Sequence, residues 1–383
     1  LARIYRLSGI CRNSSYLFLD SLHDRSRISD VPPSASALRY YLAGCRILLA
    51  QKAFSMYSCY PLIGEYLDGT TASGLYEAKL GKECMGKENH IFSPAYREDE
   101  FEEVLESCEH LVFNSFSQLE CFGERAAKAG KSVGIRVNPE CSTQGEHAIY
   151  DPCAPGSRLG ILVSEFPETL PSYVEGLHFH TLCEQNADAL EITLKAVEEK
   201  FGKWMKQLKW VNFGGGHHIT RADYDRELLI SCVRRIQDTY NVQVYLEPGE
   251  AVALNAGHLI TTVEDIVHND IAVLDVSAAC HMPDVIEMPY RPPLFDSGEA
   301  KEKEYTYLLG GPTCLAGDVI GSYSFDQPLK VGDRLTFGDM AIYTTVKNNT
   351  FNGMRLPDIV WERESGECEI VKSFGYEDFK CRL

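Results

Sequence analysis

The chain has 383 residues, of which 44% are hydrophobic and 24% are charged, a composition typical of a globular protein large enough for two domains. Its formal net charge of −18 argues against a nucleic-acid partner or an acidic membrane surface and is compatible with a cationic small molecule. The 14 cysteines follow no disulfide-scaffold spacing, and no signal peptide or long apolar segment stands out, so we expect a cytoplasmic protein without a membrane partner.

Short apolar runs alternate with helix-period segments over the first two thirds of the chain. A strand-like segment at 15–20 comes first, and a polar loop separates it from a helical pattern over 37–43. Eight further runs predict strands at 47–50, 69–74, 90–93, 110–114, 133–138, 174–180, 210–213 and 242–247. Helix-period segments lie at 101–108, 117–129, 188–208 and 224–240, the second with Ser117 as its N-cap and Glu120 three residues later.

Strands that alternate with helices pair in parallel, and eight of them fit a (β/α)8 barrel of the TIM type, with a doubly wound open sheet as the alternative. After Pro248 the sequence becomes strand-rich, with runs at 257–267, 271–276, 305–309, 334–337 and 343–346. We therefore expect an α/β protein with a barrel over 36–247. A second, antiparallel β domain is expected over 1–35 and 248–383, and the early strand at 16–19 would join it.

A single lysine closes the first apolar run of the predicted barrel. Lys52 follows Arg46-Ile-Leu-Leu-Ala-Gln, and an ammonium among apolar residues is costly unless it is paired or consumed in a covalent bond. Taken alone, the lysine favours a side chain that simply extends from the strand end into solvent, because strands often finish on a charge. In a barrel, however, it would share one mouth with the residues that end three later strands.

Those three strand ends carry histidine, glycine and glutamate. The segments are His178-Phe-His180, Gly214-Gly-Gly216 followed by two histidines, and Glu247-Pro-Gly-Glu250. A glycine triplet lets backbone N–H groups approach a phosphate, although it can also be a flexible turn. We interpret His178 as a packed core residue. A metal site that combines these histidines with His217 or His218 is disfavoured, because the spacing matches no zinc pattern and we expect no cluster of carboxylate ligands nearby.

Taken together, these motifs resemble the fold-type III pyridoxal-phosphate decarboxylases, relatives of ornithine and diaminopimelate decarboxylases and of alanine racemase. The resemblance runs from about residue 46 to about 351, and six motifs in order are far more specific than any one of them. It implies that Lys52 forms the Schiff base with pyridoxal 5'-phosphate and that Glu247 faces the pyridine nitrogen. It further implies that His180 stacks on the cofactor ring.

The same resemblance implies roles for other residues. Gly214, Gly215 and Gly216 would hold the phosphate, with Tyr343 of the Asp339-Met-Ala-Ile-Tyr segment nearby and Arg136 also at the cofactor. Cys314, in Gly310-Gly-Pro-Thr-Cys, would be the proton donor, although it can equally be a structural cysteine. In relatives this cysteine comes from the second subunit, so the resemblance implies a homodimer with shared active sites.

Several segments resemble the branch of the family that decarboxylates carboxynorspermidine and carboxyspermidine. Glu250 stands where ornithine and diaminopimelate enzymes usually have arginine, and the segment after Cys314 lacks the acidic residue of diaminopimelate enzymes. The implied substrate residues, which can alternatively line a solvated rim, are Glu250, His281, Asp284, Arg291 and Asp318. The acids would hold a distal ammonium, and Arg291 would contact the carboxylate. Diaminopimelate decarboxylation, racemisation and a catalytically silent binding homologue are the alternatives.

Overall fold

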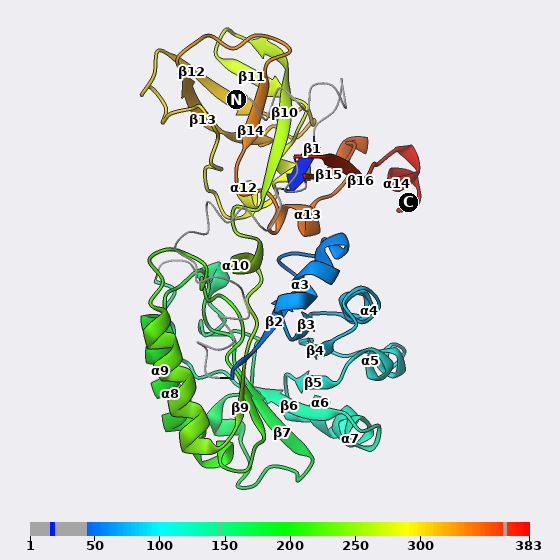
Figure 1. Cartoon of the computed structure of the whole chain (residues 1–383), viewed down its shortest axis with the longest axis vertical. Helices are drawn as coiled ribbons and strands as arrows, with labels where there is room; N and C mark the ends of the chain where they lie inside the picture. Colours follow the sequence, from blue (N-terminus) through cyan, green and yellow to red (C-terminus); the bar gives the residue numbers. More distant parts are fainter. Residues whose placement is uncertain (1–15, 20–43, 146–147, 363–365) are drawn as a thin grey trace. The chain divides into compact units, whose positions relative to one another are not determined.

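A computed structural model of the chain describes residues 16–19, 44–145, 148–362 and 366–383 (Figure 1). These residues form two compact units, the first ending at Val252 and the second comprising 16–19 and everything described from Ala253 onwards. The helical pattern expected over 37–43 lies outside the described residues, as does most of the segment 1–35. The domain bounds drawn from the sequence therefore stay a prediction.

The first unit is a closed barrel of parallel strands. In order around the ring they are β2 (Arg46–Ala50), β3 (Gly69–Ala72), β4 (Glu88–Phe92), β5 (His110–Phe113), β6 (Ser132–Arg136), β7 (Val174–His178), β8 (Trp210–Asn212) and β9 (Gln243–Leu246). Closure comes from the first and last strands, because Arg46 pairs with Tyr245 and Ile47 with Leu246. The eight predicted strands and the barrel are thus confirmed, and the open sheet is excluded.

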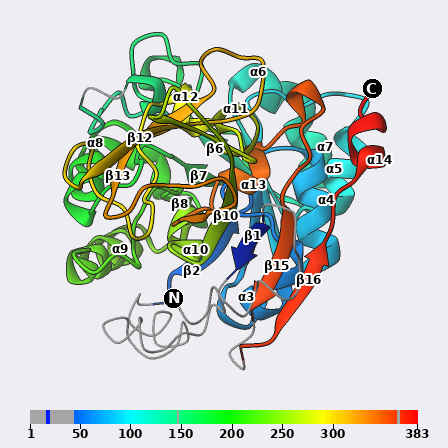
Figure 2. The same ribbon diagram turned by 90° about the horizontal axis from the view of Figure 1, so that it is seen from above.

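Helices surround the barrel, and three of them were missed in the sequence. They are α3 (Tyr60–Tyr66), α4 (Leu75–Cys84), α5 (Phe101–Ser107), α6 (Phe116–Gln118), α7 (Glu124–Lys128), α8 (Ala187–Met205), α9 (Arg226–Tyr240) and α10 (Glu250–Ala253). Helices α4 and α5 pack together along one flank, and α8 and α9 along the other (Figure 2). The missed helices are α3 and α4, which show no clear apolar period, and α10, which has only four residues.

The helix predicted over 117–129 differs in its start and in its interior. Its N-cap is Ser115, whose hydroxyl accepts a hydrogen bond from the Gln118 backbone N–H at 3.2 Å, so the assignment of Ser117 as the cap is wrong. Between α6 and α7 the chain forms a π-helical segment over Leu119–Gly123. The wider turn lets the apolar side chains of this segment stay buried while the helix continues.

A tryptophan fills the centre of the barrel. The ring of Trp210 lies against Gly134 and Gly176 on the two preceding strands, and a Cβ at Gly176 would lie 1.9 Å from the indole. The indole N–H donates to the Ser132 hydroxyl at 2.8 Å. Because two neighbouring strands carry glycine at the same level, an aromatic side chain can occupy the space that barrel interiors normally fill with several aliphatic ones.

The second unit is built on a mixed β-sheet. Its strands are β1 (Tyr16–Leu19), β10 (Gly257–Val267), β11 (Ile271–Leu274), β12 (Tyr305–Gly310), β13 (Val319–Phe325), β14 (Arg334–Phe337), β15 (Asp358–Glu362) and β16 (Cys368–Lys372). The early strand β1 joins this unit by pairing with β10 and β15, as predicted. The prediction of a purely antiparallel sheet is wrong, because β1 pairs with β15, and β11 with β12, in parallel.

Short helices also occur in this unit. They are α11 (Ala278–His281), α12 (Asp284–Glu287), α13 (Thr344–Lys347) and α14 (Tyr376–Lys380). The strand predicted over 343–346 is wrong, since Tyr343 has a φ of 52° and the chain then turns into α13, where the Lys347 N–H donates to the Tyr343 carbonyl. Among the described residues, no helix combines the length and the apolar character needed to span a membrane.

Candidate active site

One pocket lies at the carboxyl ends of the barrel strands, where this fold places its chemistry. Lys52 lies in the turn directly after β2, and its neighbours come from β3, β4, β6, β7 and the segments after β7, β8 and β9. The lining residues are Ala50, Lys52, Thr71, Ala72, Ser73, Phe92, Arg136, His178, His180, Gly215 and Glu247. The structure therefore brings together five of the predicted site residues: Lys52, Arg136, His180, Gly215 and Glu247.

Lys52 and His180 face each other across this pocket. The Lys52 Nζ lies 3.5 Å from the His180 Nε2, while the other ring nitrogen, Nδ1, accepts a hydrogen bond from the Gly215 N–H at 2.7 Å. The Lys52 side chain is accessible to solvent through the pocket mouth but is surrounded by protein, so burial, and then Arg136, lower the pKa of its ammonium. Burial and Lys52 also hold the pKa of His180 well below its ordinary value. A neutral ring with the proton on Nε2 is the state that this geometry favours.

Arg136 ends β6 and is held by the segment after β7 that carries His180. Its side chain is 4% exposed, its Nη2 donates to the His180 carbonyl at 3.1 Å, and its guanidinium lies 4.5 Å from the centre of the Phe92 ring. Burial lowers the pKa of Arg136 to about 10, against an opposing attraction from Glu247. The guanidinium is thus a fixed positive charge beside the Lys52 amine.

Glu247 follows β9 and is 8% exposed, with a donor on each carboxylate oxygen. Oε1 accepts from the Asn212 side-chain amide at 2.7 Å, and Oε2 lies 3.3 Å from the His178 Nε2. Burial alone would raise the pKa of Glu247, but His178 and Asn212 outweigh it and hold the carboxylate below its ordinary pKa. His178, interpreted from the sequence as a packed core residue, is 2% exposed and in addition contacts Glu247 and lines the pocket.

The glycine triplet is required because two of its residues have a positive φ and because the neighbouring backbone leaves no room for a Cβ atom. Gly214 has a φ of 70° and Gly216 a φ of 82°, and a Cβ at Gly215 would lie 2.4 Å from the Glu247 carbonyl oxygen. The loop thereby passes close to the pocket without a side chain of its own. One of its N–H groups, that of Gly215, is already bonded to His180.

Glu250 belongs to a second polar cluster in the same unit. The carboxylates of Glu184 and Glu250 and one ring nitrogen of His218 lie within 4.8 Å of one another, and the His218 Nε2 is 3.5 Å from a Glu250 oxygen. Burial raises the pKa of Cys183, the carboxylates of Glu184 and Glu250 raise it further, and Lys52 lowers it, so the cluster lies close to the Lys52 pocket. The expectation that no carboxylates lie near these histidines is wrong.

The other predicted site residues belong to the second unit. Cys314 is exposed and its backbone N–H donates to the Asn352 side chain at 2.8 Å. Asp318 is 4% exposed; it accepts hydrogen bonds from the Ser277 hydroxyl at 2.9 Å and from the Thr313 hydroxyl at 2.6 Å. Asp318 therefore holds the loop that carries Cys314 in place, and its charge is used within the protein.

His281 and Arg291 also have protein partners for their side-chain nitrogens. In His281 the Nδ1 accepts from the Ser277 N–H and the Nε2 lies 3.1 Å from the Arg355 carbonyl. The Arg291 guanidinium donates to the carbonyls of Ser322 and Gly298, forms an ion pair with Glu299 and lies over the Tyr323 ring. A substrate contact by either residue would require one of these bonds to open.

Asp284 and Tyr343 are the last two of the site residues predicted from the sequence. Lys347 forms ion pairs with both Asp284 and Glu287, so this group of three keeps one net negative charge. Tyr343 lies directly before α13 in a backbone conformation that is unusual for a residue other than glycine. Such a conformation is often found at functional sites, where the surrounding structure enforces it.

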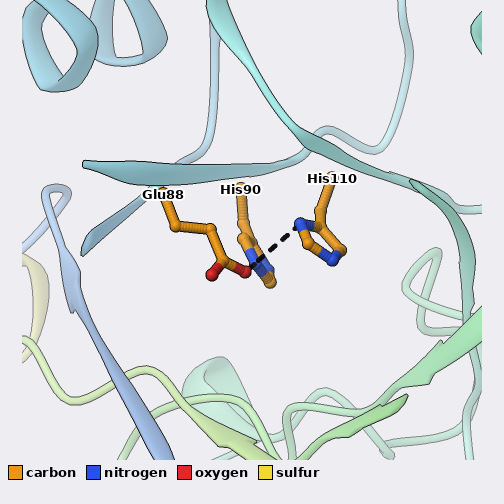
Figure 3. Close-up of side chains that lie close together, drawn as sticks. All are labelled: Glu88, His90 and His110. Atoms are coloured by element: carbon orange, nitrogen blue, oxygen red, sulfur yellow. Dashed lines mark hydrogen bonds and ion pairs between the residues drawn. The ribbon is translucent and has the colours of Figure 1, made fainter. Parts of the chain in front are cut away.

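A third polar cluster lies near the amino ends of β4 and β5 (Figure 3). One oxygen of Glu88 lies 2.8 Å from the His90 Nε2 and 3.4 Å from the His110 Nδ1, and the second oxygen forms an ion pair with Arg46. The two imidazole rings are stacked with their centres 4.0 Å apart. Both Glu88 oxygens thus have partners within the protein, so this arrangement suits a partly buried hydrogen-bond network.

Comparisons with known proteins agree with this geometry. Residues 21–341 match a family described as pyridoxal-dependent decarboxylase, C-terminal sheet domain. The chain is 47% identical over 353 residues to a carboxynorspermidine/carboxyspermidine decarboxylase of Campylobacter jejuni, covering 89% of this chain and 92% of the relative. It is 41% identical over 345 residues to a carboxyaminopropylagmatine decarboxylase of Synechocystis, with 89% of each chain covered.

Among solved structures, the fold matches that of carboxynorspermidine decarboxylase from Campylobacter jejuni complexed with norspermidine. The TM-score is 0.87 and the sequence identity is 44%, with 97% of this chain and 100% of the other covered. The likeness therefore spans both described units, each of which has its counterpart in that structure.

Proposed function

Since this chain belongs to the family of pyridoxal-dependent decarboxylases, we propose that it releases CO2 from carboxynorspermidine and carboxyspermidine in polyamine biosynthesis. The observation that carries the reaction type is the convergence of Lys52, His180 and Glu247 on one pocket. The identity and coverage of the Campylobacter jejuni relative support the substrate.

The pocket fits pyridoxal 5'-phosphate. It offers an amine at Lys52, a flat neutral ring at His180, a buried anion at Glu247 and a loop at Gly214–Gly216 into which a Cβ would intrude. In our proposal Lys52 would hold the cofactor aldehyde, His180 would pack on the ring and the glycine loop would face the phosphate. The cofactor supplies the electron sink that lets the bond to a carboxylate break.

Glu247 would face the ring nitrogen of the cofactor. Its two donors keep the carboxylate ionised, so it favours the protonated nitrogen through a charge-assisted hydrogen bond. Arg136 supports Lys52 in a different way, because a fixed cation nearby favours the neutral amine, which is the form that can bind an aldehyde. These assignments rest on the distances within the barrel.

For the second unit we propose that Cys314 donates the proton that replaces CO2 and that Tyr343 lies near the phosphate. In a homodimer, Cys314 of one subunit would serve the Lys52 pocket of the other. Its exposure supports this role, as do the exposed apolar side chains of Leu315 beside it and Phe351 beside Asn352. All 13 cysteines of the described residues are free thiols, which supports a cytoplasmic location.

We propose that the cluster of Glu184, His218 and Glu250 holds the distal ammonium of the substrate. The three acceptors lie within 4.8 Å of one another, close enough for a single ammonium to donate to all of them, and the two carboxylates supply the opposite charge. The same carboxylates would repel the second carboxylate of diaminopimelate, the alternative substrate of this fold.

A second candidate substrate is carboxyaminopropylagmatine, which the 41% identity to the Synechocystis relative favours. Its distal group is a guanidinium, planar and larger than an ammonium, so a site built for three convergent acceptors would bind it less well. We therefore rank it second.

The test is CO2 release from carboxynorspermidine, carboxyspermidine, carboxyaminopropylagmatine, diaminopimelate and ornithine by the purified protein loaded with pyridoxal phosphate. We expect the first two to be preferred over diaminopimelate by roughly a thousandfold in kcat/KM, since burying a carboxylate beside acidic groups costs several kcal/mol. The Lys52→Ala variant is the control, and it should neither turn over nor form a borohydride-reducible bond to the cofactor. Comparable kcat/KM values for diaminopimelate and carboxynorspermidine would refute the assignment.

A further inference from the structure

The side chain of Asn212 connects two parts of the candidate site. It ends β8, is completely buried, and makes two hydrogen bonds in opposite senses. Its Nδ2 donates to the Glu247 carboxylate at 2.7 Å, and its Oδ1 accepts from the Gly214 backbone N–H at 2.8 Å. A single amide thus lies between the carboxylate and the first residue of the glycine loop.

The two partners fix the orientation of this amide. If oxygen and nitrogen were exchanged, an amide oxygen would face the Glu247 carboxylate and an NH2 group would face the Gly214 N–H, which are two repulsive contacts. Of the side chains with the same shape, only asparagine both donates on one side and accepts on the other. An aspartate can do so only when it carries a proton.

The Gly214 N–H bond also stabilises an unusual conformation. Gly214 has a φ of 70°, and its carbonyl accepts from the Glu247 backbone N–H at 2.8 Å. The glycine is therefore bonded to Glu247 directly through the backbone and indirectly through Asn212. A change at either end of the Asn212 side chain is transmitted to the other.

We propose that Asn212 is a positioning residue that keeps Glu247 ionised and in place to face the ring nitrogen of the cofactor, while holding the glycine loop in its phosphate-facing conformation. The proposal rests on the proposed function, because it assumes that pyridoxal phosphate occupies this pocket. It adds a residue that acts through Glu247 and Gly214 without touching the substrate.

The Asn212→Asp variant tests the hydrogen bond to Glu247 separately from the hydrogen bond to Gly214. The aspartate keeps an acceptor for Gly214 but places two carboxyl groups 2.7 Å apart, so the pair must share a proton, and the second ionisation must occur at a higher pH. We expect the affinity for pyridoxal phosphate at pH 6 to stay within about threefold of the wild type, because one good acceptor remains. Turnover should fall as the pH rises through the new ionisation, in a range where the wild type is flat.

Asn212→Ala removes both bonds and should weaken cofactor binding about tenfold or more at every pH, since a buried N–H and a buried carboxylate each lose a partner. Binding is measured by titrating the cofactor-free protein with pyridoxal phosphate and following its absorbance, which needs no turnover. The visible spectrum of each loaded variant is then recorded against pH.

Asn89→Asp is the matched control. Asn89 is a buried amide of β4 that donates to the Ala78 and Ser107 carbonyls, away from the pocket lining. It should lower thermal stability without adding an ionisation to the spectrum or the rate. If Asn212→Asp shows the same pH profile as the wild type, or if Asn89→Asp shifts it equally, the proposal is overturned.

The outcome for Asn212 is separable from that for the substrate. If the wild type releases no CO2 from any of the five compounds, the proposed function fails, yet the binding titration and the pH-dependent spectrum still report on Asn212. If the wild type is active but Asn212→Ala binds the cofactor as tightly as the wild type does, the function stands and the positioning role is wrong.

Discussion

Replacing Glu247 by glutamine changes one buried charge and keeps the size of the side chain. The carboxylate is 8% exposed, so solvent screens its attraction to a protonated ring nitrogen only weakly. A hydrogen bond to a charged group is worth roughly 1.5 to 3 kcal/mol. Losing it in the transition state corresponds to a fall in kcat of about 10- to 150-fold.

The same substitution should also lower stability. A glutamine carbonyl can still accept from Asn212, but its NH2 group would then face the His178 Nε2, which donates in the native arrangement. His178 could reverse its tautomer, yet its Nδ1 is buried with no hydrogen-bond partner among the described residues. The cost of a buried unsatisfied donor is about 1 to 3 kcal/mol, visible as a lower midpoint in urea unfolding.

The assay is steady-state CO2 release with carboxynorspermidine, which separates kcat from KM. Glu88→Gln is the control, because Glu88 is another carboxylate of the barrel with histidine neighbours but lies outside the pocket lining. It should lose stability and keep its kcat. The reasoning about Glu247 fails if Glu247→Gln keeps kcat within about twofold of the wild type, or if only KM changes.

Three further outcomes are expected. Glu250→Gln should raise the KM for carboxynorspermidine about tenfold or more, because one acidic partner of the ammonium is lost, and should raise the kcat/KM for diaminopimelate relative to that for carboxynorspermidine. An equal fall in kcat/KM for both substrates would contradict the role. Mixing inactive Lys52→Ala and Cys314→Ala proteins should restore about a quarter of wild-type activity if sites are shared in a dimer, and none if each subunit is self-contained. Burial lowers the pKa of His217 and of His281 to about 4, so both stay neutral in the folded state while the unfolded chain takes up protons below about pH 6.5. Stability should therefore be full above pH 6.5 and fall on acidification by roughly 1.4 kcal/mol per pH unit for each, measured by urea unfolding at several pH values; a shallower slope in His217→Gln would confirm its share, and an unchanged slope would refute it.

The barrel was readable from the sequence because its strands are short, nearly continuous apolar runs. The run from Ile47 to Ala50 is buried along its whole length, so its composition alone identifies a strand covered on both faces. Helix α4 was not readable, because it buries only three residues and has no pronounced apolar stripe. The segment after Tyr343 was mistaken for a strand, because threonine and valine favour strands while the positive φ of Tyr343 is set by the surrounding structure.

The sequence predicted those site residues whose type alone points to a chemical role. Lys52, Gly215 and Glu247 stand at strand ends and meet in one pocket, as the barrel rule requires. The contributions of His178 and Asn212 were missed because both contact Glu247, which lies far along the chain. A local signal did exist, since each stands two residues before a predicted site residue and thus at an inward-facing strand end.

The packing of Trp210 constrains how this barrel can change by mutation. A larger residue at Gly134 or Gly176 would collide with the indole, and overpacking of this kind costs about 1 to 3 kcal/mol or more. A smaller residue in place of Trp210 would leave a cavity that costs about 3 to 5 kcal/mol. Each single step is therefore harmful, whereas a compensated pair need not be. The three positions should consequently show strong epistasis, with double variants such as Trp210→Leu with Gly176→Ala more stable than the sum of their single effects allows.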